Sequence, residues 1–353
     1  MIALLTATGA TAQVNKIKWS AFPGIPDQEG FAGMYAGVSS GAIIAMGGAN
    51  FPDKYPWENG VKKWYDHIYV KPAGGNWQRA KESLPVPAGY GVSVSYQNKV
   101  IIAGGCTDTH HLKTVFSYEW VNGELKKETL PDLPFPLAYM TGELVEDALV
   151  LLGGAETPTG PALKTALVLD LKNPNSGWQE IESWPGPERK LPVSGVWNNR
   201  VYLMSGETAN TNPLGEVYRD ILLDNYALTL TREGRKWKAT WQKMAPIPRG
   251  VAAAGNLPLL DNDKFLIWGG VDRVTAQYRT PATHPGINRT VLFYYPQNDT
   301  WEYLGEQLSY QSRVTLAVIP YENSWLYISG EIKPGVRTPS NIQIHKSTQT
   351  FAK

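Results

Sequence analysis

The stretch Val100-Ile-Ile-Ala-Gly-Gly105, a short apolar run that ends in two glycines, decides the fold because the chain repeats it in altered form. Six such runs end in Gly-Gly or Ser-Gly: Ala42–Gly48, Val100–Gly105, Leu149–Gly154, Val201–Gly206, Phe265–Gly270 and Trp325–Gly330. Their final glycines lie 57, 49, 52, 64 and 60 residues apart. Repeats at this spacing indicate one structural unit built six times.

Each repeat continues in the same order, which is that of a propeller blade. A middle strand with an apolar core follows the glycines, at 67–70, 114–118, 166–170 and 290–295. An outer strand then often carries tryptophan, at Trp77, Trp178, Trp241 and Trp301. The next inner strand is rich in small residues, as in Gly89–Val94 and Gly250–Gly255. Small residues suit a crowded axis and tryptophans fill the wider rim. The pattern predicts an all-β, six-bladed propeller of the kelch type, formed as one domain by residues 13–353.

The last repeat lacks its outer strand, and the other end of the chain supplies a candidate for it. Residues 340–345 read as the third strand of the sixth blade. Residues 15–22, which include Trp19, have the character of the missing outer strand. We therefore expect the N-terminal strand to pair with the C-terminal blade, since that pairing removes two open sheet edges.

Composition excludes several classes of function. The 353 residues include 33 Lys and Arg against 32 Asp and Glu, which gives a net charge of +1. The sequence therefore lacks the excess of positive charge that is typical of nucleic-acid-binding proteins. No run of about 20 apolar residues predicts a membrane span. The one cysteine, Cys106, excludes an internal disulfide and a cysteine-based zinc site.

Residues 1–12 are small or apolar and end in Ala10-Thr-Ala12, a pattern that signal peptidase cuts. The basic region that normally precedes such a run is missing. We interpret the segment as a signal-peptide remnant, which predicts export to the periplasm, with an apolar tail as the alternative.

The loops that follow each Gly-Gly pair should rim a central well, and loops on a rigid scaffold carry binding groups. On these loops we take Asn50, Glu207, Glu331 and Lys333 as candidates. Arg189, Arg249 and Arg313 each precede an inner strand. They form either a cationic well for a small anion or structural ion pairs between loops.

Other motifs point away from metal or nucleophile chemistry. His110 and His111 are adjacent and lack an evident third ligand, so we interpret them as a solvated loop pair. The chain contains neither a Gly-x-Ser-x-Gly elbow nor a phosphate-binding Gly-x-x-x-x-Gly-Lys.

Two segments resemble a known family. Gly30-Phe-Ala-Gly-Met-Tyr-Ala-Gly-Val38, followed by Ile44–Phe51, is similar to the N-acetylneuraminate epimerases, the bacterial sialic acid mutarotases. So is Gly330-Glu-Ile-Lys-Pro-Gly-Val-Arg-Thr338. In that family the second motif precedes the first, and the chain thus resembles a cyclically permuted branch. The resemblance covers the repeat array and is sharp only in these segments.

This resemblance implies an isomerase that interconverts the α- and β-anomers of N-acetylneuraminic acid without metal or cofactor. Its catalytic pair maps to Glu331, as the base, and Arg337, which would hold the substrate carboxylate with Arg313 or Arg249 nearby. The expected partner is a small acidic sugar, while the general acid and the oligomeric state stay open. The alternatives are a non-catalytic propeller that binds carbohydrate or protein, or an enzyme acting on another acidic sugar, such as a second mutarotase or a lyase.

Overall fold

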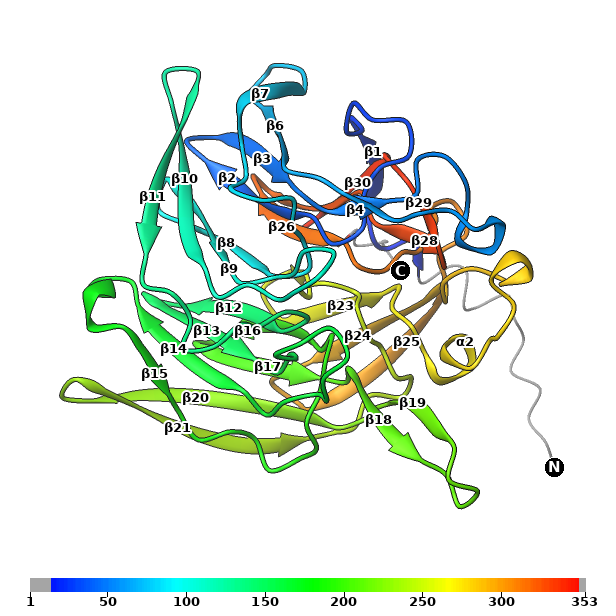
Figure 1. The fold of residues 1–353 in the computed structure, drawn as a ribbon. Helices are drawn as coiled ribbons and strands as arrows, with labels where there is room; N and C mark the ends of the chain where they lie inside the picture. The colour runs from blue at the N-terminus through cyan, green and yellow to red at the C-terminus, as the bar shows by residue number, and fades with distance from the viewer. Residues whose placement is uncertain (1–13, 349–353) are drawn as a thin grey trace.

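The computed structural model describes residues 14–348, which form six four-stranded antiparallel sheets arranged around a central axis (Figure 1). The predicted all-β, six-bladed propeller is confirmed. The signal-peptide interpretation falls on residues 1–12, outside the described part. Of the helices within residues 14–348, none has both the length and the apolar character needed to cross a bilayer.

The blades follow one another along the chain, each with its strands ordered from the axis outward. Blade 1 is β2 (Tyr35–Ser39), β3 (Ala42–Met46), β6 (His67–Lys71) and β7 (Gln78–Ser83); blade 2 is β8 (Val92–Tyr96), β9 (Lys99–Ala103), β10 (Val115–Val121) and β11 (Glu124–Leu130); blade 3 is β12 (Thr141–Val145), β13 (Ala148–Leu152), β14 (Ala166–Asp170) and β15 (Trp178–Glu180). Blade 4 is β16 (Val193–Trp197), β17 (Arg200–Met204), β20 (Asn225–Glu233) and β21 (Lys236–Met244); blade 5 is β22 (Leu259–Leu260), β23 (Lys264–Trp268), β24 (Thr290–Tyr295) and β25 (Thr300–Glu306); blade 6 is β26 (Ala317–Tyr321), β27 (Ser324–Ile328), β30 (Asn341–His345) and β1 (Trp19–Phe22).

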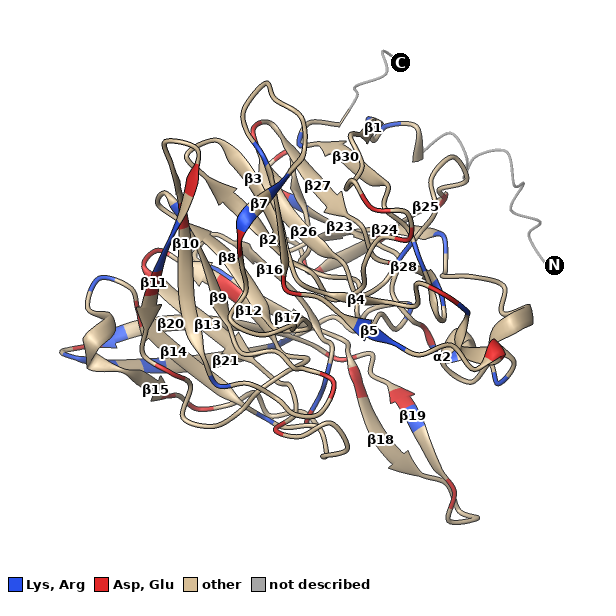
Figure 2. Cartoon of the chain, turned by 45° about the horizontal axis from the view of Figure 1, so that its top comes forward, with Lys and Arg blue, Asp and Glu red and all other residues tan. Residues whose placement is uncertain are grey.

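The loops at one end of the blades carry additional small elements. Three hairpins lie there: β4 (Ala49–Asn50) with β5 (Lys63–Trp64), β18 (Glu207–Thr211) with β19 (Val217–Ile221), and β28 (Glu331–Lys333) with β29 (Val336–Arg337). The short helices η1 (Pro56–Glu58), α2 (Arg273–Ala276) and η3 (Pro281–Thr283) lie in the same set of loops, whereas η2 (Pro174–Ser176) joins β14 to β15 at the opposite end. The β18–β19 hairpin projects from the ring, and acidic and basic residues are interspersed over the strands in the view of Figure 2.

The ring closes as the sequence predicts. β1 is the outer strand of blade 6 and pairs with β30 in the register Trp19↔Ile344 to Phe22↔Asn341. Trp19 also packs edge-on against Trp268 of blade 5, with ring centroids 4.9 Å apart. The N-terminal strand thus joins the last blade and packs on the blade before it.

One predicted inner strand is wrong. Residues 250–255 were expected to form the inner strand of blade 5, but that strand is β22, Leu259–Leu260. Ala253 and Gly255 have φ values of +63° and +79°. A left-handed backbone cannot continue an extended strand, so the small residues form a turn at the axis instead.

Six equivalent positions form a closed ring of hydrogen bonds on the axis. Each blade contributes one residue with positive φ, and its backbone N–H donates to the carbonyl of the residue at the equivalent position in the preceding blade. The bonds are Gly33 to Thr315 (2.6 Å), Tyr90 to Gly33 (2.8 Å), Tyr139 to Tyr90 (2.9 Å), Leu191 to Tyr139 (2.7 Å), Ala253 to Leu191 (2.9 Å) and Thr315 to Ala253 (2.7 Å). We call these six residues the axial ring. In every blade the residue before the ring position bridges the residue after the glycine pair, for example Val314 to Glu331.

Candidate active site

Glu331 and Arg337 lie together on the β28–β29 hairpin, next to the axial ring. Glu331 directly follows the last glycine of blade 6, and it pairs in register with Arg337. Its bridge to Val314 places it beside the ring residue Thr315. Gly335, with φ +81°, makes the turn between the two strands. The hairpin therefore holds both side chains beside the axial ring, at the end of the central axis where the loops after the glycine pairs meet. We call this end of the axis the mouth.

The two side chains form a largely buried ion pair. Arg337 Nη2 lies 2.9 Å from Glu331 Oε2, and the side chains are 4% and 18% exposed. Arg337 Nε donates to the Ala49 carbonyl of blade 1 at 3.3 Å, and its guanidinium lies 4.8 Å from the Phe51 ring centroid. Arg337 Nη1 is buried and has no hydrogen-bond partner among residues 14–348. Buried donors are normally paired, so this one is available to an anionic ligand.

Burial raises the pKa of the Glu331 carboxyl above its usual value. The positive charge of Arg337 acts in the opposite direction, and Lys62 and Arg219 add smaller effects of the same sign. Desolvation favours the neutral acid, whereas nearby cations favour the carboxylate. The result is a carboxylate that is more basic than a free glutamate, as proton abstraction requires.

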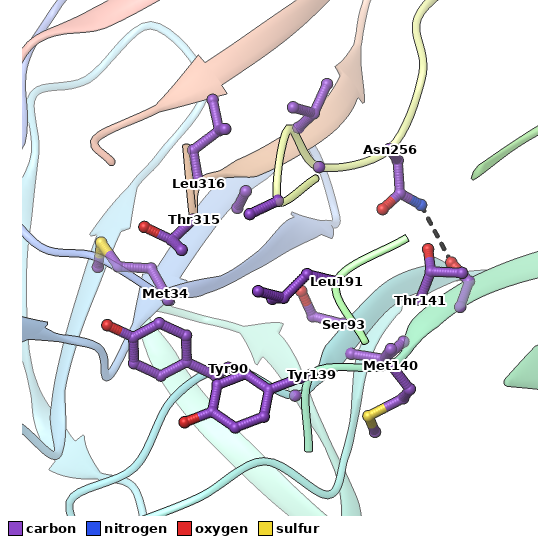
Figure 3. Close-up of a pocket in the computed structure, with 18 of the residues that line it drawn as sticks. Met34, Tyr90, Ser93, Tyr139, Met140, Thr141, Leu191, Asn256, Thr315 and Leu316 are labelled. Atoms are coloured by element: carbon purple, nitrogen blue, oxygen red, sulfur yellow. Dashed lines mark hydrogen bonds between the residues drawn. The ribbon is translucent and has the colours of Figure 1, made fainter. Parts of the chain in front are cut away.

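Lys62, Tyr90 and Tyr139 belong to the same mouth. Lys62 Nζ lies 4.5 Å from the centroid of the Tyr90 ring and 4.3 Å from that of Trp64. Figure 3 shows the rings of Tyr90 and Tyr139 side by side, with their hydroxyl groups directed to the same side of an axial cavity of about 100 Å³. Burial raises the pKa of both phenols, and Arg337 and Glu331 both act on Tyr90.

Blades 2 to 4 contribute further polar groups near Tyr139. Its hydroxyl lies 3.6 Å from Cys106 Sγ, and its ring meets His111 edge-on at 5.4 Å. The Glu207 charge also acts on this phenol, and Glu207 pairs with Arg219 of β19. Since Arg219 acts in turn on Glu331, these groups surround one mouth.

The interpretation of the two histidines as a solvated pair is wrong for one of them. His110 is exposed, but His111 is 4% exposed and its Nδ1 lies 2.9 Å from the Ala155 carbonyl. Burial lowers the pKa of His111, so the ring is neutral and Nδ1 is the donor. Within residues 14–348 no group of three or more His, Cys, Asp or Glu side chains could hold a metal ion.

The sequence left two roles open for Arg189, Arg249 and Arg313, a cationic well or structural contacts, and the hydrogen bonds of the structure favour the second. Arg189 is 0% exposed; it donates to the Ser205 carbonyl at 2.8 Å and pairs with Asp224 at 2.6 Å. Arg313, 2% exposed, donates to the Ser329 and Ser340 carbonyls. Arg249 Nη2 donates to the Gly269 carbonyl at 3.1 Å. Each guanidinium thus holds the backbone just before a final glycine, which is the structural role that the sequence left open. None of the three is directed into the mouth.

The remaining predicted residues occupy the mouth or its rim. Asn50 is buried, donates to the Gly30 carbonyl and accepts from the Tyr65 hydroxyl, so its amide fixes the β4 loop. Glu207 faces Arg219, as described above. Lys333 lies on the outer rim, where its amine contacts the Ala282 carbonyl and the Trp57 ring.

Sequence reasoning missed Lys62, Tyr90 and Tyr139. The two tyrosines have a detectable signal, because they occupy the same position in successive repeats, directly after Gly89 and Ala138. Lys62 has none, since it lies in the loop that follows the glycine pair of blade 1, outside the segments that repeat from blade to blade.

Comparisons with known proteins agree with this architecture. A family model described as N-acetylneuraminate epimerase matches residues 4–126. The N-acetylneuraminate epimerase of Salmonella arizonae is 29% identical over 235 residues, which cover 60% of this chain and 56% of that protein. The Haemophilus influenzae (strain PittEE) protein of the same name is 35% identical over 244 residues, 61% of this chain and 59% of that one.

The match therefore spans little more than half the length of these relatives. A solved structure, that of YjhT, superposes with a TM-score of 0.65 over 90% of this chain and 95% of its own, at 16% identity. At that identity the likeness supports the fold alone. The sequence matches show that part of this chain is similar to the N-acetylneuraminate epimerases.

Proposed function

We propose that the protein is a mutarotase that interconverts the α- and β-anomers of N-acetylneuraminic acid. The observation that carries the proposal is the buried Glu331–Arg337 pair, in which the guanidinium keeps one buried N–H donor, Nη1, without a partner. The names of the relatives support the choice of sugar.

Arg337 is suited to hold the substrate carboxylate. Its Nη2 and Nε are engaged by Glu331 and Ala49, so the guanidinium is fixed before a ligand arrives. Guanidinium–carboxylate bonds are charge-assisted and short, and they are stronger where water is excluded. A fixed donor at Nη1 therefore binds a carboxylate with little loss of side-chain entropy.

Glu331 is suited to remove the proton from the anomeric hydroxyl. Loss of that proton drives cleavage of the bond between the anomeric carbon and the ring oxygen, which must gain a proton. The open-chain keto acid then turns its carbonyl face and closes again, and Glu331 returns its proton to the new anomeric oxygen. Each proton that is taken is given back, so the cycle consumes no co-reactant.

The test is to release α-N-acetylneuraminate in the presence of the purified protein and to follow the anomers by NMR. We expect equilibration well above the buffer rate. A rate equal to that of buffer would exclude mutarotation of this sugar. If the protein bound N-acetylneuraminate without accelerating its equilibration, a carbohydrate-binding propeller would be favoured. If it accelerated the anomer equilibration of another acidic sugar only, a different substrate would be favoured.

A further inference from the structure

Lys62 is a cation at the mouth without a carboxylate partner. It lies in the loop between η1 and β5, and its amine rests against the rings of Trp64 and Tyr90 at 4.3 and 4.5 Å. It makes no ion pair within 4.0 Å in the described part of the chain, residues 14–348. Aromatic faces stabilise a cation without accepting its protons as a carboxylate would. The ammonium protons of Lys62 are thus free to meet a ligand.

The charges of the catalytic pair act directly on this amine. Burial, together with the charge of the neighbouring Arg337 guanidinium, lowers the pKa of Lys62 to about 8, although Cys106 and Glu331 act in the opposite direction. An amine that titrates near neutral pH can give up a proton and recover it within one catalytic cycle. An ordinary surface lysine holds its proton too tightly to do so.

Space for a sugar lies next to this amine. Lys62 lines a cavity of about 580 Å³ between the loops of blades 1 and 2, together with apolar groups such as Trp64, Val86 and Pro87. The charges of Glu331 and Arg337 act on both the Lys62 amine and the Tyr90 phenol, although neither residue lines this cavity. Lys62 is therefore near the charges of the ion pair and also lines a cavity that could hold the rest of a ligand.

We propose that Lys62 is the second proton-transfer group of the site, donating to the ring oxygen of the sugar while Glu331 takes the anomeric proton. The proposal rests on the mutarotase function proposed above. As the anomeric carbon–ring oxygen bond breaks, its electron pair stays on the oxygen, which takes a proton from the Lys62 ammonium. When the chain closes on the other face, the neutral amine takes that proton back from the attacking hydroxyl.

Other groups at the mouth fit this role less well. Burial raises the pKa of the Tyr90 and Tyr139 phenols, which makes them weaker acids. His111 is neutral, and its Nδ1 proton is given to the Ala155 carbonyl. Arg337 retains its protons at neutral pH.

Two substitutions separate proton transfer from charge. Lys62→Met keeps the apolar stem against Trp64 and Tyr90 but removes the amine. Lys62→Arg keeps the positive charge but cannot release a proton near neutral pH. We expect both variants to lower kcat by roughly 10² or more, the usual contribution of a positioned acid, with KM of Lys62→Arg within about threefold of wild type. Lys54→Met serves as the control and should keep the wild-type rate, because Lys54 is an exposed lysine between β4 and η1.

The pH profile gives an independent readout. Wild-type kcat/KM should fall on the alkaline side with a midpoint near 8, because kcat/KM reports the titration of the free enzyme. This limb should vanish from the residual activity of Lys62→Arg. A Lys62→Arg rate within threefold of wild type would overturn the proposal. So would a wild-type profile of kcat/KM that stays flat between pH 7 and 9, and this second test does not depend on whether a variant folds.

The two proposals fail in different ways. A wild-type protein that does not accelerate equilibration removes both. An active wild type with an inactive Glu331→Gln variant and fully active Lys62 variants removes Lys62 alone. Melting temperatures of all variants, compared with wild type, distinguish loss of the proton donor from loss of the fold.

Discussion

The Gly33 N–H donates a 2.6 Å hydrogen bond to the Thr315 carbonyl, and this bond joins blade 6 to blade 1 on the axis. With it, the axial ring is complete: six residues, one from each blade, donate and accept in turn. Five of the six carry a side chain although all six have positive φ. A left-handed conformation costs a residue with a Cβ roughly 1–2 kcal/mol, so closure of the ring maintains strained backbone at five positions near the Glu331–Arg337 pair.

Gly33→Ala should destabilise the protein and displace Tyr90. A Cβ at Gly33, where φ is +73°, would lie 2.7 Å from the Tyr90 ring. We expect a loss of about 1–3 kcal/mol in the free energy of unfolding, measured with urea, and a lower kcat/KM. The matched substitution at an equivalent ring position is Ala253→Gly, which relieves strain and should change stability by less than about 1 kcal/mol. Equal losses from both substitutions would contradict this account of the ring.

Glu331→Gln should abolish most turnover while leaving the fold intact. The amide keeps the shape of the carboxylate but cannot accept the anomeric proton, so we expect kcat to fall by roughly 10²–10⁴. Anomer equilibration followed by NMR measures the effect. Glu156→Gln is the control, because Glu156 is an exposed carboxylate on the corresponding loop of blade 3. Wild-type turnover in Glu331→Gln would remove this residue from the role of base.

Activity should fall on the acid side at a pH above the usual titration range of glutamate. Glu331 accepts a proton only when ionised, and burial raises its pKa. As pH decreases through that raised value, the carboxyl becomes neutral and kcat/KM declines. The pH dependence of kcat/KM in the free enzyme reports this titration. An acid limb at or below about 4.3, the value of an unperturbed glutamate, would show that burial does not control the base.

Arg189→Met should reduce stability without weakening sugar binding. The substitution leaves Asp224 without its partner and the Ser205 carbonyl without its donor. Breaking a buried pair in this way costs about 3–5 kcal/mol, which a urea titration can detect. Calorimetric titration with N-acetylneuraminate should give a Kd within about twofold of wild type. A large loss of affinity in a folded variant would return Arg189 to the binding site.

The sequence was sufficient for the blades because their signals are local. An apolar run that ends in glycines, such as Val100–Gly105, needs only nearest-neighbour conformational preferences to be recognised. The pairing of β1 with β30 was also predictable, since a blade that lacked one strand left a single candidate. The Glu331–Arg337 pair came from a motif whose residues are close in sequence. The reversed order of the two family motifs stays a prediction.

The rest of the mouth depends on contacts between blades that no local pattern encodes. Lys62 meets Tyr90 of the next blade, and Arg337 reaches the Ala49 carbonyl from blade 6 to blade 1. Arg189 and Arg313 share a repeat position with access to the axis, but their long side chains turn into the blade, where unpaired carbonyls accept them. Whether an arginine at this position points toward the axis or turns into the blade depends on its tertiary neighbours.

The ring can close during synthesis only when β30 is available to pair with β1. Ser20 of β1 and Gln343 of β30, which face each other in this strand pair, are 323 residues apart in the sequence. At about 5–20 residues per second, a ribosome needs roughly 15–65 s to cover that distance. Trp268, on which Trp19 packs, is made only in blade 5, and until β30 has been made the incomplete ring presents an open sheet edge to other chains. The open edges of the ring are therefore removed only after the last blade has been synthesised.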